Sequence, residues 1–214
     1  MKQLDRILAE KLLKISAIKL QPANPFVWAS GWNSPIYTDN RKTLSYPDVR
    51  SFIKVELCRM IMENFETPDA IAGVATGAIA QGALVADTMG LPYVYVRSTP
   101  KNHGLENLIE GNLKPGQKVV VIEDLISTGG SCIEVVNVLR EAGAEVLGIV
   151  SIFTYGMKKG LTRLAEANVK NVSLTDFDCI AEIAARENYI KQEDVKRLIA
   201  FRNNPSDESW IGVK

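Results

Sequence analysis

Hydrophobic and polar positions follow two different periods along the chain. Apolar residues recur at helical spacing between residues 3 and 15. They recur again after Pro47, where a proline and an acid stand in the first turn of a helix that we expect to end near Phe65. From Asp69 onward, short apolar runs alternate with amphipathic segments. This alternation predicts an α/β fold with a mostly parallel central sheet flanked by helices on both faces.

The same pattern gives approximate element boundaries. The expected strands are 70–74, 92–96, 119–122, 146–153 and 172–174, and the expected helices are 79–89, 131–142, 159–168 and two more at the C-terminus. Residues 97–115 have no apolar period and predict a long loop. Residues 17–41 are short extended stretches broken by Pro, Asn and Gly. We therefore divide the chain into a small N-terminal α+β hood, residues 1–45, and a core domain, residues 46–214, within one structural unit.

Composition limits the class of function. Lys+Arg and Asp+Glu are both 25, so no overall field attracts nucleic acid or a membrane surface. No apolar run approaches the ~20 residues of a membrane span, and the first ten residues do not resemble a signal peptide. Three widely spaced cysteines suit a reducing compartment. We expect a cytoplasmic protein with no nucleic-acid or membrane partner.

The most informative segment is 119–131. A run of β-branched residues predicts a buried strand, which Glu123 and Asp124 follow, and Ser-Thr-Gly-Gly-Ser at 127–131 then leads into a helix. A Gly-rich turn that enters a helix directs N–H groups and the positive end of the helix dipole at an anion. Helix capping explains the hydroxyls and glycines, but not two acids at the end of an apolar strand, where desolvation costs free energy. We interpret the segment as a phosphate cradle beside acids that can hold sugar hydroxyls and stabilise a cation.

A second candidate segment follows the strand 92–96. Arg97, Lys101 and His103 lie within seven residues of one another in the expected loop. Arg and Lys suit a pyrophosphate leaving group, and His103, with an ordinary pKa of ~6.5, can donate a proton near neutral pH. Taken alone, the segment is explained equally well as a solvated surface loop. Beside a phosphate cradle, it is better explained as a functional lid.

The hood segment 26–41 is dense in aromatic and hydroxyl side chains. Aromatic faces beside polar groups can stack on a flat heterocycle. From composition alone, however, packing of the hood on the core explains Trp28 and Tyr37 better.

These segments together resemble a known family. The apolar strand, Glu-Asp, two apolar residues and Ser-Thr-Gly-Gly are similar to the phosphoribosyl pyrophosphate motif of the type I phosphoribosyltransferases. Arg97 with Lys-Asn-His-Gly at 101–104, and Ser-Gly-x-x-Ser-Pro-x-Tyr ending at Tyr37, resemble the orotate branch of that family. The Ala-Thr-Gly turn at 75–77 and Ser-Ile-Phe-Thr-Tyr at 151–155 resemble its Gram-positive type. The resemblance spans almost the whole chain.

The resemblance implies a fold, an activity and a set of roles. It implies the type I phosphoribosyltransferase fold and transfer of the 5-phosphoribosyl group from phosphoribosyl pyrophosphate to orotate in UMP biosynthesis. Mg²⁺ is the implied cofactor, held through the substrate near Asp124. Lys101, His103 and Asp124 are the implied catalytic residues, and Ser127 and Tyr37 the implied orotate contacts. The residues implied to bind phosphoribosyl pyrophosphate are Arg97, Lys101, His103, Glu123, Asp124, Leu125, Ile126, Ser127, Thr128, Gly129, Gly130 and Ser131. The implied assembly is a homodimer whose catalytic loop reaches the neighbouring subunit's site.

Departures from the family pattern leave alternatives open. Where family members carry cations for orotate, this chain has Ala29, Asn33 and Tyr155. A purine phosphoribosyltransferase would share the phosphate motif but has no reason for this loop and hood together. A non-catalytic regulator that senses phosphoribosyl pyrophosphate and binds nucleic acid would need an additional basic surface or domain.

Overall fold

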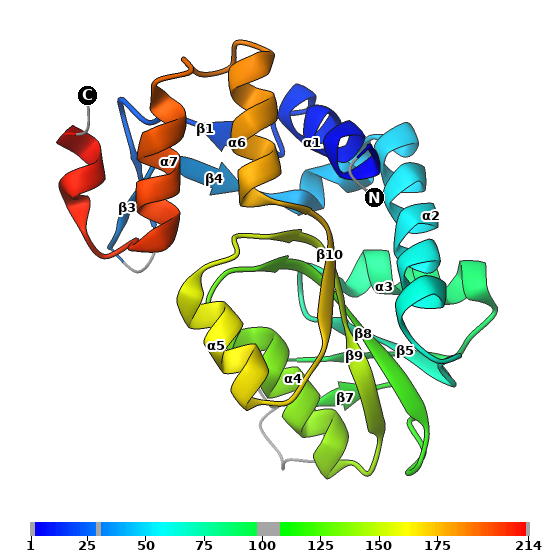
Figure 1. Ribbon diagram of the computed structural model, residues 1–214. Helices are drawn as coiled ribbons and strands as arrows, with labels where there is room; N and C mark the ends of the chain where they lie inside the picture. Colours follow the sequence, from blue (N-terminus) through cyan, green and yellow to red (C-terminus); the bar gives the residue numbers. More distant parts are fainter. Residues whose placement is uncertain (1–2, 29–30, 98–107, 213–214) are drawn as a thin grey trace.

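A six-stranded sheet forms the centre of the computed structural model, which describes residues 3–28, 31–97 and 108–212 (Figure 1). All neighbouring strands are parallel except the last pair, which is antiparallel. The prediction of a mostly parallel sheet is therefore confirmed. In order across the sheet, the strands are β10 (Asn171–Asp176), β9 (Glu145–Thr154), β8 (Lys118–Ile126), β5 (Ala70–Val74), β6 (Tyr93–Val96) and β7 (Ile109–Glu110).

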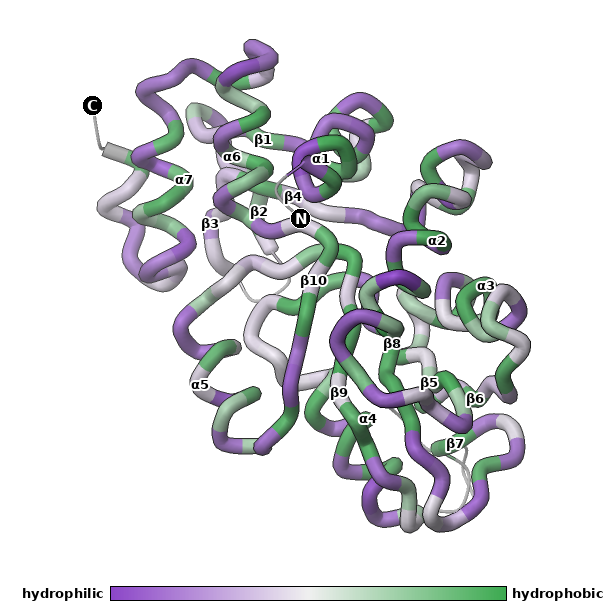
Figure 2. The backbone as a smooth tube through the Cα atoms, turned by 45° about the vertical axis from the view of Figure 1, so that its right-hand side comes forward, coloured by the Kyte–Doolittle hydropathy of each residue, from purple (hydrophilic) through white to green (hydrophobic). Residues whose placement is uncertain are grey.

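Helices cover both faces of this sheet (Figure 1). One face carries α4 (Gly130–Glu141) and α5 (Lys158–Glu166), and the other carries α2 (Pro47–Asn64) and α3 (Ile79–Met89). Because both faces are covered, the central strands are apolar without interruption: every residue of β5 is buried, and Val119 to Ile122 of β8 are fully buried. Figure 2 shows hydrophobic residues gathered along these strands, while the helices alternate between the two kinds of residue.

Two predicted boundaries were wrong. The strand expected at 119–122 extends to Ile126, because β9 runs alongside it and pairs with Glu123, Leu125 and Ile126. Both acids therefore lie within the strand rather than after it. Part of the loop expected at 97–115 is also a strand, since β7 pairs with the exposed edge of β6.

The order of the strands reverses between β5 and β8. The chain passes from β5 to β6 in one direction across the sheet, and from β8 to β9 and β10 in the other. The connecting helices therefore lie on opposite faces and leave a crevice at the carboxyl ends of β5 and β8. A ligand of this sheet is expected in that crevice, where the predicted phosphate segment begins.

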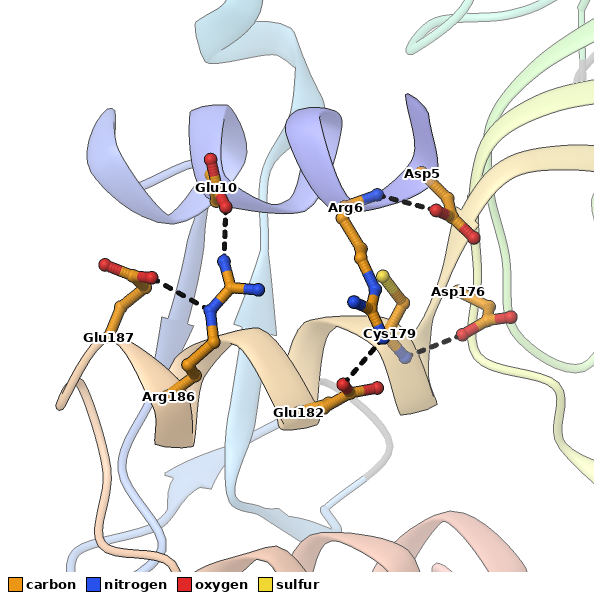
Figure 3. Close-up of polar contacts among 8 residues, drawn as sticks. All are labelled: Asp5, Arg6, Glu10, Asp176, Cys179, Glu182, Arg186 and Glu187. Atoms are coloured by element: carbon orange, nitrogen blue, oxygen red, sulfur yellow. Dashed lines mark hydrogen bonds and ion pairs between the residues drawn. The ribbon is translucent and has the colours of Figure 1, made fainter. Parts of the chain in front are cut away.

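The N-terminal hood, residues 1–45, packs against the C-terminal helices. In chain order, the elements of the hood are α1 (Leu4–Lys14), β1 (Ile18–Leu20), β2 (Phe26–Val27), β3 (Asn33–Ser34), β4 (Ile36–Thr38) and the 3₁₀ helix η1 (Asn40–Ser45). The C-terminal elements α6 (Phe177–Arg186), α7 (Asp194–Asn203) and η3 (Glu208–Gly212) lie beside these. Helix α1 packs along α6, and ion pairs of Arg6 with Glu182 and of Arg186 with Glu10 cross the contact (Figure 3). The hood is thus closed by segments far apart in sequence.

Trp28 joins the hood to the core. Its ring meets those of Tyr155, at the end of β9, and Phe201 of α7 edge-on, with centroids 5.5 and 5.6 Å apart. Its Nε1 donates a hydrogen bond to the Ile36 carbonyl at 3.2 Å. Hydrophobic packing therefore accounts for Trp28, as composition suggested. No described helix combines the length and hydrophobicity that a membrane span requires.

Two residues of α1 allow the contributions of packing and of charge to stability to be compared. Leu12 of α1 is fully buried, whereas about half of the Glu10 side chain is exposed. We expect L12A to lower the free energy of unfolding by about 2–5 kcal/mol, because a cavity adds to the lost burial. The matched variant E10Q should have a much smaller effect, because solvent screens its ion pair. Urea denaturation of both variants measures this; equal losses would contradict the packing argument.

Candidate active site

Glu123 and Asp124 are held differently at the tip of β8. Glu123 is 3% exposed, and its Oε1 and Oε2 accept hydrogen bonds from the Asp124 N–H at 2.9 Å and the Ser131 hydroxyl at 3.4 Å. Asp124 is half-buried, and its Oδ1 accepts from the Leu125 N–H at 2.9 Å. Successive side chains of a strand point to opposite faces, so the two carboxylates reach the tip from opposite sides.

Burial raises the pKa of both carboxyls. For Glu123 the pKa lies well above its ordinary value of 4.5, first because of desolvation and second because of the neighbouring Asp124 charge. Desolvation also raises the pKa of Asp124, while Arg41 of η1 works against the rise. Strongly perturbed carboxyls at the mouth of a crevice are typical of functional sites.

The turn after β5 lies directly against Asp124. A β-carbon on Gly77 would lie 2.5 Å from the Asp124 Cγ, too close for any side chain. The peptide between Ala75 and Thr76 in this turn is cis. Gly77 thus allows backbone from β5 and a carboxylate from β8 to meet at the crevice.

The segment 127–131, where the phosphate cradle is predicted, forms a turn that enters α4. Gly129 has a φ of +74°, which favours glycine, and precedes the first residue of α4. Among the described residues, the amides from Thr128 to Cys132 donate no hydrogen bond to protein. These N–H groups and the α4 dipole are therefore available to an anion. Helix α5 supports the loop from behind: Gly160 packs on Ser127, and the Arg163 Nη1 lies 3.5 Å from the Thr128 carbonyl oxygen.

Sequence reasoning missed a buried polar cluster beneath the acids. Asn40 of η1 is 1% exposed and donates from Nδ2 to the Asp124 carbonyl at 2.7 Å. The Thr43 hydroxyl donates to the Asn40 carbonyl at 2.6 Å and accepts from Gln81 of α3 at 3.2 Å. The cluster links hood, helix and strand tip. The only signal in the sequence was the Asp-Asn-Arg run at 39–41, which does not reveal that Asn40 is buried.

Arg97 follows β6 on the other side of the crevice. A cavity of about 250 Å³ is lined by Ala75, Arg97 and Ser131, among others, so the predicted leaving-group anchor opens on the same space as the cradle. Its Nη1 lies 3.5 Å from a Glu110 carboxylate oxygen. The side chain is therefore already balanced by an acid before any ligand binds.

Of the two predicted orotate contacts, Tyr37 lies in the hood and Ser127 follows β8. Tyr37 of β4 is 42% exposed, and its ring is tilted against Phe26 at 5.7 Å. The next residue, Thr38, accepts a hydrogen bond from the Tyr155 hydroxyl at 3.1 Å, and the Tyr155 N–H donates to the Ile126 carbonyl at 2.8 Å. Strand β4 is thereby tied to the end of β8, next to Ser127.

Comparisons with known proteins agree with this geometry. Residues 55–184 match the family described as phosphoribosyl transferase domain. A Bacteroides fragilis orotate phosphoribosyltransferase is 60% identical over 206 residues, which cover 96% of this chain and 97% of that protein. The Bacillus cereus protein of the same name is 55% identical over 204 residues, which cover 95% and 97% of the two chains. The chain belongs to the orotate phosphoribosyltransferase family.

Solved structures support the fold assignment. The orotate phosphoribosyltransferase of Aeropyrum pernix aligns with a TM-score of 0.74 at 30% identity, covering 86% of this chain and 99% of that one. The predicted type I phosphoribosyltransferase fold is therefore confirmed. The Bacillus cereus relative agrees with the predicted likeness to the Gram-positive type. Neither alternative, the purine enzyme or the nucleic-acid regulator, is supported by these relatives.

Several predicted residues of the orotate phosphoribosyltransferase pattern lie outside the described part of the chain. These are Lys101 and His103 of the loop, and Ala29 of the hood. The structure brings Glu123, Asp124 and the cradle segment together at the tip of β8, and Arg97 lines a cavity that reaches Ser131 of that segment.

The acid pair also decides whether the site fits a magnesium ion. Within the described residues, no three His, Cys, Asp or Glu side chains converge as a metal-binding group. Asp124, half-buried at the crevice, offers carboxylate oxygen, the ligand that Mg²⁺ prefers. The residues therefore fit an ion that binds mainly through substrate oxygens and water, with Asp124 alongside.

The raised pKa of Glu123 predicts a stability that depends on pH. A carboxyl whose pKa is higher in the folded than in the unfolded state destabilises the fold as the pH rises above the unfolded value. We expect E123Q to be more stable than wild type near neutral pH, and this advantage to shrink as the pH falls toward 4.5. Urea denaturation across that range measures it. A stability difference that does not vary with pH would contradict the burial argument.

Proposed function

We propose that the protein transfers the 5-phosphoribosyl group from phosphoribosyl pyrophosphate to orotate, giving orotidine 5'-monophosphate and pyrophosphate. One observation carries the proposal: free amides of segment 128–131, the buried Glu123 and the half-buried Asp124 meet where β5 and β8 end. The family membership supports the same reaction. The proposal includes a cytoplasmic location and UMP biosynthesis as the process served.

The cradle and the acids bind different parts of the sugar phosphate. The amides of residues 128–131, with the hydroxyls of Ser127, Thr128 and Ser131, hold the 5-phosphate at the N-terminus of α4. Leu125 and Ile126 connect the acids to the cradle along the chain. Glu123 and Asp124 accept hydrogen bonds from the ribose hydroxyls, and the Asp124 charge stabilises the oxocarbenium-like transition state as orotate attacks C1 with inversion.

The leaving group is bound on the other side. Arg97 anchors the pyrophosphate, and Lys101 and His103 close over it as its charge rises. When bound, Mg²⁺ would neutralise part of that charge beside Asp124. Closure excludes water, which would otherwise capture the sugar cation. No protein nucleophile is required, because positioning and charge complementarity lower the barrier.

The hood, residues 1–45 in this proposal, covers the base. Tyr37 contacts the orotate ring, and backbone groups near Ser127 meet its polar edge. The hydrogen bonds from Thr38 through Tyr155 to Ile126 fix the hood strand relative to the cradle, which supports this arrangement.

A substrate panel tests the reaction. With Mg²⁺ and phosphoribosyl pyrophosphate, we expect the ultraviolet assay to show consumption of orotate, but not of uracil, adenine or hypoxanthine. D124N should lower kcat about 100- to 1000-fold, because it removes charge that acts on the transition state. Circular dichroism and thermal unfolding serve as controls for folding. Preference for a purine, or binding of nucleic acid in a gel shift without any turnover, would overturn the proposal.

Mixed subunits test the homodimer with a shared loop. K101A and D124N, each inactive alone, are unfolded together and refolded at equal amounts. We expect about a quarter of the wild-type activity, because half of the dimers are mixed and each has one intact site. A loop that serves its own subunit would give no recovery. Native mass spectrometry must show mixed dimers before a negative result counts against the shared loop.

A further inference from the structure

A cationic cleft lies between α5 and the end of α7. It has a volume of about 490 Å³, and its lining includes four cations and no acid: Lys158, Lys159, Arg163 and Arg202. The chain as a whole has equal numbers of acidic and basic residues, so this lining is a local excess of positive charge. Such a cleft favours an anionic ligand.

The position of the cleft relates it to the candidate active site. Thr128 of the phosphate cradle is part of its lining, and Trp32 of the hood forms another part. A ligand there would lie beside the 5-phosphate position and under the hood. Trp32 and Met157 supply apolar surface to the same walls, which suits a flat ring that carries a charged group.

Arg202 differs from the other cations in its surroundings. Its side chain is 23% exposed, whereas Lys158, Lys159 and Arg163 are exposed residues. Its Nη2 pairs with Asp178 of α6 at 3.2 Å. Its Nε is buried without a hydrogen-bond partner among the described residues, and none of them accepts a bond from its Nη1. The protein therefore leaves the hydrogen-bonding capacity of this guanidinium incompletely used.

Gly156 brings Arg202 close to the end of β9. A β-carbon on Gly156 would lie 3.8 Å from the Arg202 Nη1, and Gly156 has a φ of +62°. Gly156 directly follows Tyr155, which is tied to both the hood strand and β8. A C-terminal side chain is thereby placed at the strand ends where the base is expected.

The other arginine of the cleft is turned toward the cradle. The Arg163 Nη1 lies 3.5 Å from the Thr128 carbonyl oxygen and 3.7 Å from the point where a β-carbon on Gly130 would lie. Arg163 therefore contacts the loop behind the cradle, and Arg202 is the cation of the cleft that is partly buried.

We propose that Arg202 binds the carboxylate of the base and sets the preference for a carboxylated pyrimidine over uracil. This inference rests on the proposed function and deepens it. A guanidinium that is partly shielded from water pairs strongly with a carboxylate. A base without the carboxylate would leave the Arg202 Nε, buried without a hydrogen-bond partner among the described residues, still unsatisfied, so the cleft disfavours it.

The test compares R202M with wild type in the full-length enzyme. We expect the KM for orotate to rise about 10- to 100-fold, the usual range for a lost charged hydrogen bond, while the KM for phosphoribosyl pyrophosphate changes little. Direct binding gives a readout without turnover. Wild type should bind orotidine 5'-monophosphate more tightly than uridine 5'-monophosphate, and R202M should bind the two alike.

Two control variants separate binding from structure. D178N removes the ion-pair partner of Arg202 but keeps the cation, so it should retain the KM for orotate. R140M removes an arginine whose guanidinium bonds the Ala167 and Asn168 carbonyls at 2.8 and 3.0 Å, and it should also retain that KM. If D178N and R202M raise both KM values equally, Arg202 is structural and the inference is overturned.

The remaining outcomes are also decisive. Should R202M not fold, R202Q removes the charge but keeps a polar side chain, and an unchanged KM for orotate in R202Q would overturn the inference. If wild type turns over orotate and R202M keeps its selectivity, this assignment alone fails. If wild type does not use orotate at all, the proposed function fails, and the assignment of Arg202 fails with it.

Discussion

The meeting of β5 and β8 at their carboxyl ends is the constraint on which the site depends. The direction of the chain across the sheet reverses there, so helices diverge to opposite faces and leave the strand tips uncovered. Gly77 has no side chain, and this lets the β5 turn touch the Asp124 carboxylate. Burying the Glu123 carboxylate beside a second acid is costly in free energy, which favours a ligand that uses the pair.

The hood extends this constraint to both chain ends. Helices α1 and α6 pack together, and Trp28 contacts Tyr155 and Phe201. The hood therefore cannot shift without disturbing the end of β9, whose Tyr155 is bonded to β4 and β8. The Asn40 amide adds a second link, to the Asp124 carbonyl. The hood and the tip of β8 are therefore positioned by one connected set of contacts.

Electrostatics in this protein are local. Acids and bases balance over the chain, yet they separate within the site: two carboxylates at the tip of β8, free amides at the start of α4, and cations along α5 and α7. In the function that we propose, these three groups bind the ribose, the 5-phosphate and the base, respectively. Because the dielectric constant is low at the partly buried positions, each interaction there is stronger than the same interaction at the surface.

The sequence by itself determined the sheet, the Gly-rich turn into α4, the acid pair and the family, because hydrophobic period and the motif at 119–131 are local properties of neighbouring residues. It did not determine the full length of β8, the strand β7 or the packing of α6 and α7 against the hood. Each of these depends on a partner distant in the chain. Asn40, Gly77 and Arg202 gave no local signal either. Only the tertiary structure brings them to the strand ends, since spatial proximity between residues far apart in sequence is set by packing.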